Sequence, residues 1–304
     1  MQLYFPGSLA VAGRVGNAFA FFTFASVLQW AQQRQMDGLG NSSWRLVFWV
    51  SSLMQLIPLA IFTWFDRVAS RLDDGQHAPR EISRSETQYS SQTSTSINNS
   101  LRILRSESKT ISFWMHLVSR SSLMIIASFL LFVPSYMTNA FGMSSSSAAK
   151  VGSMYALGSL LSVSFGAKRF SASTKKTKII TSLALLGSLL GCCLLQLAHI
   201  IGKIHISPIG GAISMFVWGV AFSIPFYIPP SMYALRRGGR LSSATVADAF
   251  DLVGFIMLAW FNGFVASRQQ DILVSWYTPF VVLTGFSLIS LVSLVAALAT
   301  EDLT

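Results

Sequence analysis

The chain has 304 residues and a net charge of +10, yet it is 52% hydrophobic and only 11% charged. Soluble domains average about 25% charged residues, so this composition excludes an ordinary water-soluble fold. Two adjacent cysteines without histidine or acidic neighbours predict neither a disulfide framework nor a metal site. In lipid every backbone polar group must be paired within its own segment, which favours helices. We therefore expect an all-α polytopic membrane protein.

Eight apolar stretches set the expected helices, because a span needs roughly 20 apolar residues. They cover residues 8–32, 44–65, 112–138, 146–167, 177–199, 208–234, 243–267 and 273–298. Two stretches precede a long polar segment and six follow it. The expected organisation is two transmembrane helices in 1–66, a linker in 67–111 and a six-helix bundle in 112–304.

The linker 67–111 is rich in Ser, Thr, Gln and Asn and poor in large apolar residues. Such a segment buries too little surface to offset its chain entropy, so we expect disorder. One interpretation is a flexible tether. The other is a regulatory loop, in which phosphate on Ser106 or Ser108 would cancel the charge of neighbouring arginines.

Basic residues collect in alternate gaps between the stretches. Sixteen of the 22 lie at the start of the first stretch, in the linker, or in the gaps around residues 168–178 and 236–240. Cytoplasmic loops retain Lys and Arg, so both termini and the linker are expected in the cytoplasm. The positive charge is then explained by topology and by anionic lipid headgroups, and no nucleic-acid partner is expected.

The gap between the first two stretches carries a family resemblance. Residues 43–49 read Ser-Trp-Arg-Leu-Val-Phe-Trp, which resembles the Trp-Arg-x-x-Phe-Trp signature opening the sixth helix of major facilitator superfamily transporters. The resemblance implies that the chain corresponds to helices 5–12 of a major-facilitator fold, truncated by four helices at its N-terminus. The linker would be the central cytoplasmic loop of that family.

A second set of residues is similar to the organophosphate branch of that family, which includes glycerol-3-phosphate antiporters. The matching positions are Tyr227-Ile228-Pro229-Pro230, Ala234-Leu235, Gly238-Gly239-Arg240 and Asp251-Leu252-Val253-Gly254. Two positions depart from the pattern. Residues 166–169 lack the acid of the usual Gly-x-x-x-Asp motif, and Arg120 lies nearly two turns before Ile126, where the branch's substrate-binding arginine would fall.

Ionisable side chains within spans are functional candidates, because burying them in lipid is unfavourable. Arg120 lies about one-third into the stretch 112–138. Its planar guanidinium would suit a carboxylate or phosphate in a polar cavity. The alternatives are a structural ion pair or an interfacial anchor.

Asp248 and Asp251 are three residues apart, hence on one face at the start of the stretch 243–267. One hypothesis is a gate that closes the cytoplasmic side through Arg236, Arg237 or Arg240. The other is simple stabilisation of two acids by a helix N-terminus.

Uncharged polar side chains at mid-span complete the substrate-binding candidates: Gln55, Tyr155, Tyr227 and Asn262. Tyr136 and the histidines at span ends, among them His116, are expected at the membrane interface instead. Pro134 and the prolines at 225, 229 and 230 are expected to kink their helices.

These residues predict a secondary active transporter that moves a small anionic organic solute, such as a sugar phosphate or other organophosphate, by alternating access. Its expected partners are the solute, a coupling ion or phosphate, and the bilayer. No cofactor, metal or enzyme activity is expected, because no phosphate loop, metal-spaced histidines or Ser–His–Asp set is visible. The competing hypothesis is a non-transporting truncated protein or scaffold whose linker recruits partners.

Overall fold

A computed structural model of the protein describes residues 26, 63–64, 102–268 and 276–301, without the side chains of residues 240–241. The first two expected spans and most of the linker lie outside the described residues. Throughout the described part the regular structure is helical, which confirms the all-α prediction. One difference concerns the linker, because its last part, residues 102–107, forms a short helix. Ile103 and Leu104 of this helix pack against a small hydrophobic cluster around Phe113 and Phe250.

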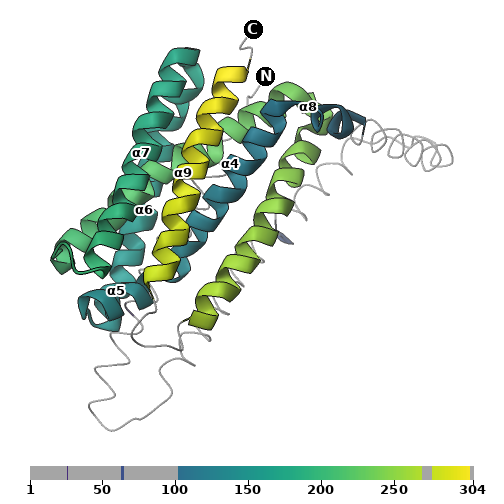
Figure 1. Ribbon diagram of the computed structural model, residues 1–304. Coiled ribbons are helices and arrows are strands. Elements are labelled where there is room, and N and C mark those ends of the chain that lie inside the picture. The colour runs from purple at the N-terminus through teal and green to yellow at the C-terminus, as the bar shows by residue number, and fades with distance from the viewer. Residues whose placement is uncertain (1–25, 27–62, 65–101, 269–275, 302–304) are drawn as a thin grey trace. The chain divides into compact units, whose positions relative to one another are not determined.

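The described helices form a bundle (Figure 1). They are α4 (Ile111–Ser128), the 3₁₀ turn η1 (Phe129–Leu131), α5 (Val133–Phe141), α6 (Ser145–Ala172), α7 (Lys175–Ile200), α8 (Pro208–Arg268) and α9 (Tyr277–Thr300). Five segments of this bundle are long and apolar enough to cross a membrane, namely Ile111–Leu131, Lys175–Ile200, Pro208–Gly239, Ser242–Ser267 and Tyr277–Thr300.

Three of the helices begin at hydroxyl residues. Thr110 caps α4 by accepting a hydrogen bond from the backbone N–H of Phe113. Ser144 and Thr174 do the same at the starts of α6 and α7. A hydroxyl at this position satisfies one of the N–H groups that the first helical turn leaves unpaired. These caps explain why the helices start within one or two residues of the expected boundaries.

The expected kink at Pro134 is present and divides the stretch 112–138. The helix α4 ends at Ser128, passes through η1, and resumes as α5 with Pro134 in its first turn. Proline is tolerated there because the first turn needs no N–H donor.

The helix α8 contains two expected spans joined by a turn of minimal length. Helical conformation is interrupted only at Gly239, whose φ is 61° and ψ is −160°. Only glycine adopts this conformation readily. At Gly238 an added Cβ would lie 2.5 Å from the backbone nitrogen of Ser243. Glycine at this position therefore allows the first arm of α8 (Pro208–Gly239) to approach its second arm (Ser242–Ser267). We expected a gap at 235–242, but the chain there is helical on both sides of Gly239.

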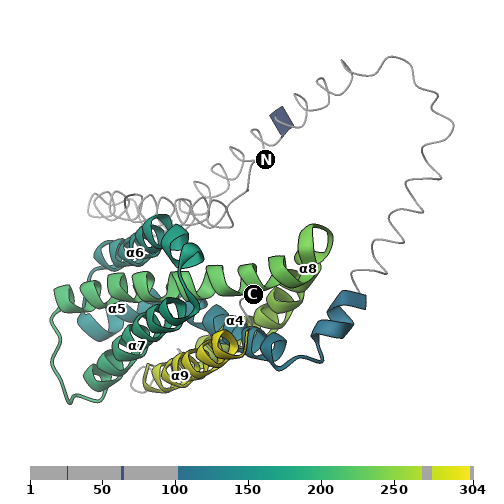
Figure 2. The ribbon, with the colours of Figure 1, turned by 90° about the horizontal axis from the view of Figure 1, so that it is seen from above.

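The first arm of α8 occupies the middle of the bundle, where α8 packs against α4, α6 and α7, while α9 packs against α4 and α7 (Figure 2). The closest approach is between α6 and α8. A Cβ on Gly158 would lie 2.3 Å from the Phe216 carbonyl oxygen, and one on Gly219 would lie 2.1 Å from that of Tyr155. Beside these glycines, Ser159 and Ser223 share a hydrogen bond. Small residues permit such backbone contact in membranes.

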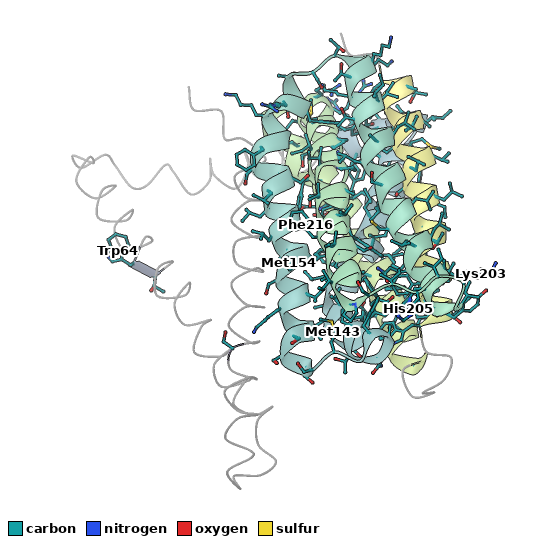
Figure 3. All side chains as sticks on the ribbon, turned by 90° about the vertical axis from the view of Figure 1, so that its left-hand side faces the viewer. Trp64, Met143, Met154, Lys203, His205 and Phe216 are labelled. Atoms are coloured by element: carbon teal, nitrogen blue, oxygen red, sulfur yellow. The ribbon has the colours of Figure 1, made fainter. Side chains whose placement is uncertain are left out.

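The two ends of the bundle differ in chemistry. We call the end that holds Lys175, the α8 turn and Glu301 the charged end. The opposite end holds Met143 and the α7–α8 connection with Lys203 and His205 (Figure 3). Between them lies an aromatic core, in which Phe129 stacks on Trp218 at 5.4 Å and contacts Phe280 at 5.1 Å. Such aromatic pairs add to the packing contribution of their buried area.

Candidate functional site

The central polar feature is an ion pair between Arg120 of α4 and Asp251 of the second arm of α8. The Arg120 Nε donates to Asp251 Oδ1 at 3.0 Å, and Nη2 lies 2.8 Å from the same oxygen. The Arg120 side chain is 14% exposed and that of Asp251 is 35% exposed. The Arg120 side chain is therefore largely shielded from solvent, whereas the Asp251 carboxylate is partly accessible.

A third element completes the surroundings of Arg120. Its Nη1 donates to the backbone carbonyl oxygen of Phe226, on the first arm of α8, at 2.6 Å. The guanidinium carbon also lies 3.7 Å from the centre of the Phe226 ring. A cation over an aromatic face is stabilised by the ring's quadrupole, and more strongly when it is shielded from water. Arg120 is thus held by an acid, a carbonyl and an aromatic ring.

This geometry changes the gating hypothesis. Asp251 pairs with Arg120 and with none of the predicted arginines whose side chains are described. Arg236 lies 3.4 Å from Glu301, Arg237 lies 3.8 Å from Glu107, and the Arg240 side chain is outside the described residues. The reason is that Arg236 and Arg237 precede the α8 turn at the charged end, whereas Asp251 lies about three turns beyond it.

Asp248 is exposed and lies one turn before Asp251 on the same arm. The second-arm acids therefore differ, because only Asp251 reaches a basic partner in the described part of the chain.

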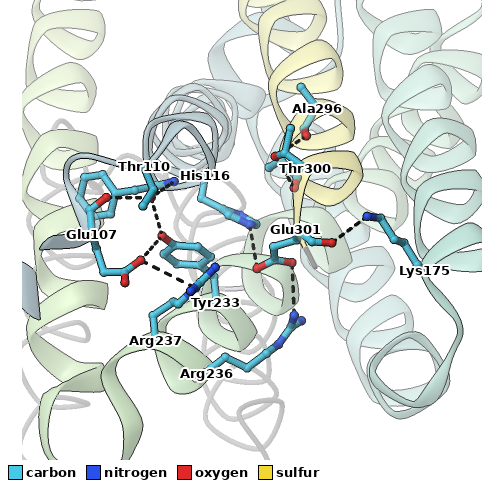
Figure 4. A network of polar contacts seen from close by, with 12 residues as sticks. Glu107, Thr110, His116, Lys175, Tyr233, Arg236, Arg237, Ala296, Thr300 and Glu301 are labelled. Atoms are coloured by element: carbon cyan, nitrogen blue, oxygen red, sulfur yellow. Dashed lines mark hydrogen bonds and ion pairs between the residues drawn. The ribbon is translucent and has the colours of Figure 1, made fainter. Parts of the chain in front are cut away.

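Glu301 organises a second polar network, at the charged end (Figure 4). Its side chain is only 4% exposed, although it directly follows α9. The carboxylate lies 3.6 Å from His116 Nε2 of α4 and 3.4 Å from Arg236 Nη1 of α8. Its backbone carbonyl accepts a hydrogen bond of 2.7 Å from Lys175 of α7. One acidic residue thus connects four helices.

The electrostatics of Glu301 follow from these neighbours. Burial by itself raises the pKa of its carboxyl group. Contact with His116 and the charges of Arg236 and Arg237 act in the opposite direction and bring the pKa below its ordinary value. Glu301 is therefore held as a carboxylate.

Glu107 forms the adjoining part of the network. Tyr233 of α8 donates a hydrogen bond of 2.7 Å to Glu107 Oε2, and Arg237 Nε lies 3.8 Å from the same atom. Thr110, the cap of α4, lies 3.3 Å from the Tyr233 hydroxyl (Figure 4). The segment before α4 is consequently tied to the first arm of α8.

His116 corrects an expectation. We predicted an interfacial histidine, but its side chain is fully buried, against the ring of Tyr233 at 4.7 Å and against Glu301. Tyr233 of α8 and Glu301 after α9 cover this side of α4 and exclude His116 from solvent.

The uncharged candidates lie at different depths. Tyr155 is fully buried and stacks on Phe222 at 6.0 Å. Tyr227 is half-buried, with Arg120 5.9 Å from its ring centre, so it adjoins the central pair. Asn262 is half-buried farther along the second arm, and Gln55 lies outside the described residues. Of these candidates the structure places Tyr227 beside Arg120.

One polar pair was not predicted. Tyr136, which we expected at the interface, is fully buried and donates a hydrogen bond of 2.6 Å to Gln196 Oε1 of α7. Gln196 is also fully buried. A glutamine in the apolar stretch 177–199 was the available signal, since a buried amide needs partners.

The glycine spacing in α7 does not coincide with close helix packing in the described structure. A Gly-x-x-x-Gly pattern such as Gly187-x-x-x-Gly191 is typical of close helix packing in membranes. An added Cβ at either position would meet nothing within 4 Å in the described structure. The close approach is instead at Gly158 and Gly219, which belong to α6 and α8.

Chemically, the central pair can bind an anion by exchange. A guanidinium edge that holds one carboxylate can hold another carboxylate or a phosphate in the same geometry. The charged end is different, because its acid is buried among several basic groups and is not accessible.

The fold and these sites define a multi-pass integral membrane protein. The sequence profile described as Major Facilitator Superfamily matches residues 7–261. The chain belongs to the Major Facilitator Superfamily, a family of secondary transporters. Comparisons with curated proteins and with solved structures gave no match.

Proposed function

We propose that the protein transports a small anionic organic solute, of the sugar-phosphate or organophosphate class, by alternating access. The observation that carries this proposal is the Arg120–Asp251 pair. It places a guanidinium between α4 and both arms of α8, with the acid side accessible. A solute anion would replace Asp251 on the Nε–Nη2 edge of Arg120.

The exchange of partners supplies a mechanism. While Asp251 holds Arg120, the two helices that carry them are joined. When a solute anion takes the guanidinium, that link opens, and the two arrangements differ in their affinity for solute. A ligand shifts a conformational equilibrium only through such a difference. Exchange of one anion for another would use the same step in both directions, as in an antiporter.

Orientation is part of the proposal. Lys175, Lys176, Arg236 and Arg237 gather at the charged end, so we assign this end to the cytoplasm. Asp251 would then contribute to a gate by its bond to Arg120, while Arg236 serves the Glu301 network.

The test is uptake of labelled glycerol-3-phosphate or inorganic phosphate into proteoliposomes. Arg120→Ala is expected to reduce uptake to background, because the anion loses its guanidinium. Arg169→Ala is the matched control, since Arg169 is an exposed arginine at the end of α6. It should transport like the wild type.

Two outcomes would overturn the proposal. Equal uptake by wild type and by folded Arg120→Ala would remove Arg120 from the site. Uptake at background for the wild type, with monodisperse protein and with a panel of carboxylates also tested, would favour a scaffold over a carrier.

A further inference from the structure

The sequence Pro229-Pro230 changes the hydrogen bonding of one particular carbonyl. In an α-helix the carbonyl of Phe226 accepts from the N–H of residue 230, and in a 3₁₀ turn from that of residue 229. Both residues are proline and have no N–H. The backbone of α8 is helical at these positions, and the interruption of the helix lies farther along, at Gly239. Neither usual donor of its own helix is therefore available to the Phe226 carbonyl.

Arg120 supplies a donor from another helix. Its Nη1 lies 2.6 Å from the Phe226 carbonyl oxygen, in a part-buried setting where a carbonyl without a partner is unfavourable. Phe226 itself is 4% exposed, and its ring lies under the guanidinium. The carbonyl and the ring together fix both the position and the plane of the Arg120 head group.

We propose that Pro230 is a positioning residue for Arg120. By withholding its N–H, Pro230 leaves the Phe226 carbonyl to bind Nη1. One corner of the guanidinium is then attached to α8, and the Nε–Nη2 edge is directed at Asp251. That edge is the one that matches a carboxylate or phosphate. The transport part of this inference rests on the proposed function, whereas the link between Pro230 and Arg120 does not.

The first experiment measures the link without any ligand, by thermal unfolding of purified protein. In an Arg120→Ala background the Phe226 carbonyl has lost its partner, and Pro230→Ala restores a helical donor. Pro230→Ala should therefore raise Tm by about 3 °C in that background, as for a hydrogen bond of ordinary strength. With Arg120 present, the same substitution replaces one partner by another, so Tm should rise less or fall.

The control is Pro229→Ala, which changes the neighbouring proline in the same turn. It restores a helical donor to the carbonyl of Pro225, and only the weaker 3₁₀ donor to that of Phe226. Its effect on Tm should be the same with and without Arg120. Equal effects of Pro230→Ala in the two backgrounds would overturn the proposal.

The second experiment measures solute recognition. In proteoliposomes that transport phosphate or glycerol-3-phosphate, Pro230→Ala should raise KM about fivefold with little change in maximal rate, and Pro229→Ala less than about twofold. A loss of maximal rate at unchanged KM would indicate a role in helix bending alone and would contradict positioning. If the wild type does not transport these solutes, the unfolding experiment still decides the link, and only the proposed function fails.

Discussion

Two of the arginine–carboxylate sites in the described bundle, at Asp251 and at Glu301, differ in how firmly the acid is held. Asp251 is 35% exposed and has Arg120 as its basic partner, whereas Glu301 is 4% exposed and contacts both His116 and Arg236. At the central site the arginine is held more firmly than the acid, because the Phe226 carbonyl and ring also bind Arg120. At the charged end the acid is the better-held member.

This difference distinguishes a site where one anion can replace another from a site that holds helices together. An accessible carboxylate with one partner can be replaced by a solute anion at modest free-energy cost. A buried carboxylate that connects several helices cannot leave without losing its contacts with His116 and Arg236. The central site is therefore suited to a changing partner, and the charged end to a permanent one.

The largest expected effect is at Glu301. Glu301→Gln keeps the shape of the side chain but removes the charge that compensates Arg236 and contacts His116. The loss of these contacts by a buried acid is expected to destabilise the protein by about 2 kcal/mol, because Arg236 is partly exposed. Unfolding in mixed micelles would measure this. Glu107→Gln should cost only about 1 kcal/mol, since Arg237 is 3.8 Å away and half-exposed. Equal losses for both variants would remove the contrast between Glu301 and the rest of the network.

A smaller effect, on binding, is expected at Asp251. Asp251→Asn removes the internal competitor for the Nε–Nη2 edge of Arg120. The affinity for inorganic phosphate should rise about fivefold, equivalent to about 1 kcal/mol. The concentration of phosphate that gives half of the maximal shift in Tm would report this change. Glu107→Gln, which alters an acid outside the central site, should leave it unchanged. Weaker binding by Asp251→Asn would mean that Asp251 assists the anion and does not compete with it.

The smallest expected effect is the pH dependence of stability. Because the folded state lowers the pKa of Glu301, its contribution to stability is fully present above the unfolded pKa of about 4.3. It is lost as the pH falls through the lower, folded pKa. Between neutral pH and about pH 5 the wild type and Glu301→Gln should therefore keep a constant difference in Tm, and below that range the two curves should converge. Parallel curves down to the lowest pH tested would contradict the assignment.

Local features of the sequence predicted much of this fold. Apolar length placed the helices, and Pro134 marked the break between α4 and α5. Each of these depends on residues that are close in the chain. The two cysteines are free and buried.

The polar pairs were not predictable in the same way. Asp251 lies 131 residues after Arg120, and its partner is decided by the rotation and depth of two helices. Hydropathy gives the length of a helix but not its register against a neighbour. Glu301 was missed for a related reason, because a residue after the last apolar stretch gives no signal of burial.

The position of the two prolines has a mechanical consequence for α8. Its first arm is fixed at one end, where Arg236 and Arg237 meet Glu301 and Glu107. Farther along this arm, the prolines at 225, 229 and 230 remove backbone donors on both sides of the carbonyl that holds Arg120. The helix is expected to bend more easily there, so strain applied to the arm should concentrate beside the guanidinium. The first arm of α8 would then bend most easily beside the guanidinium to which an anion binds.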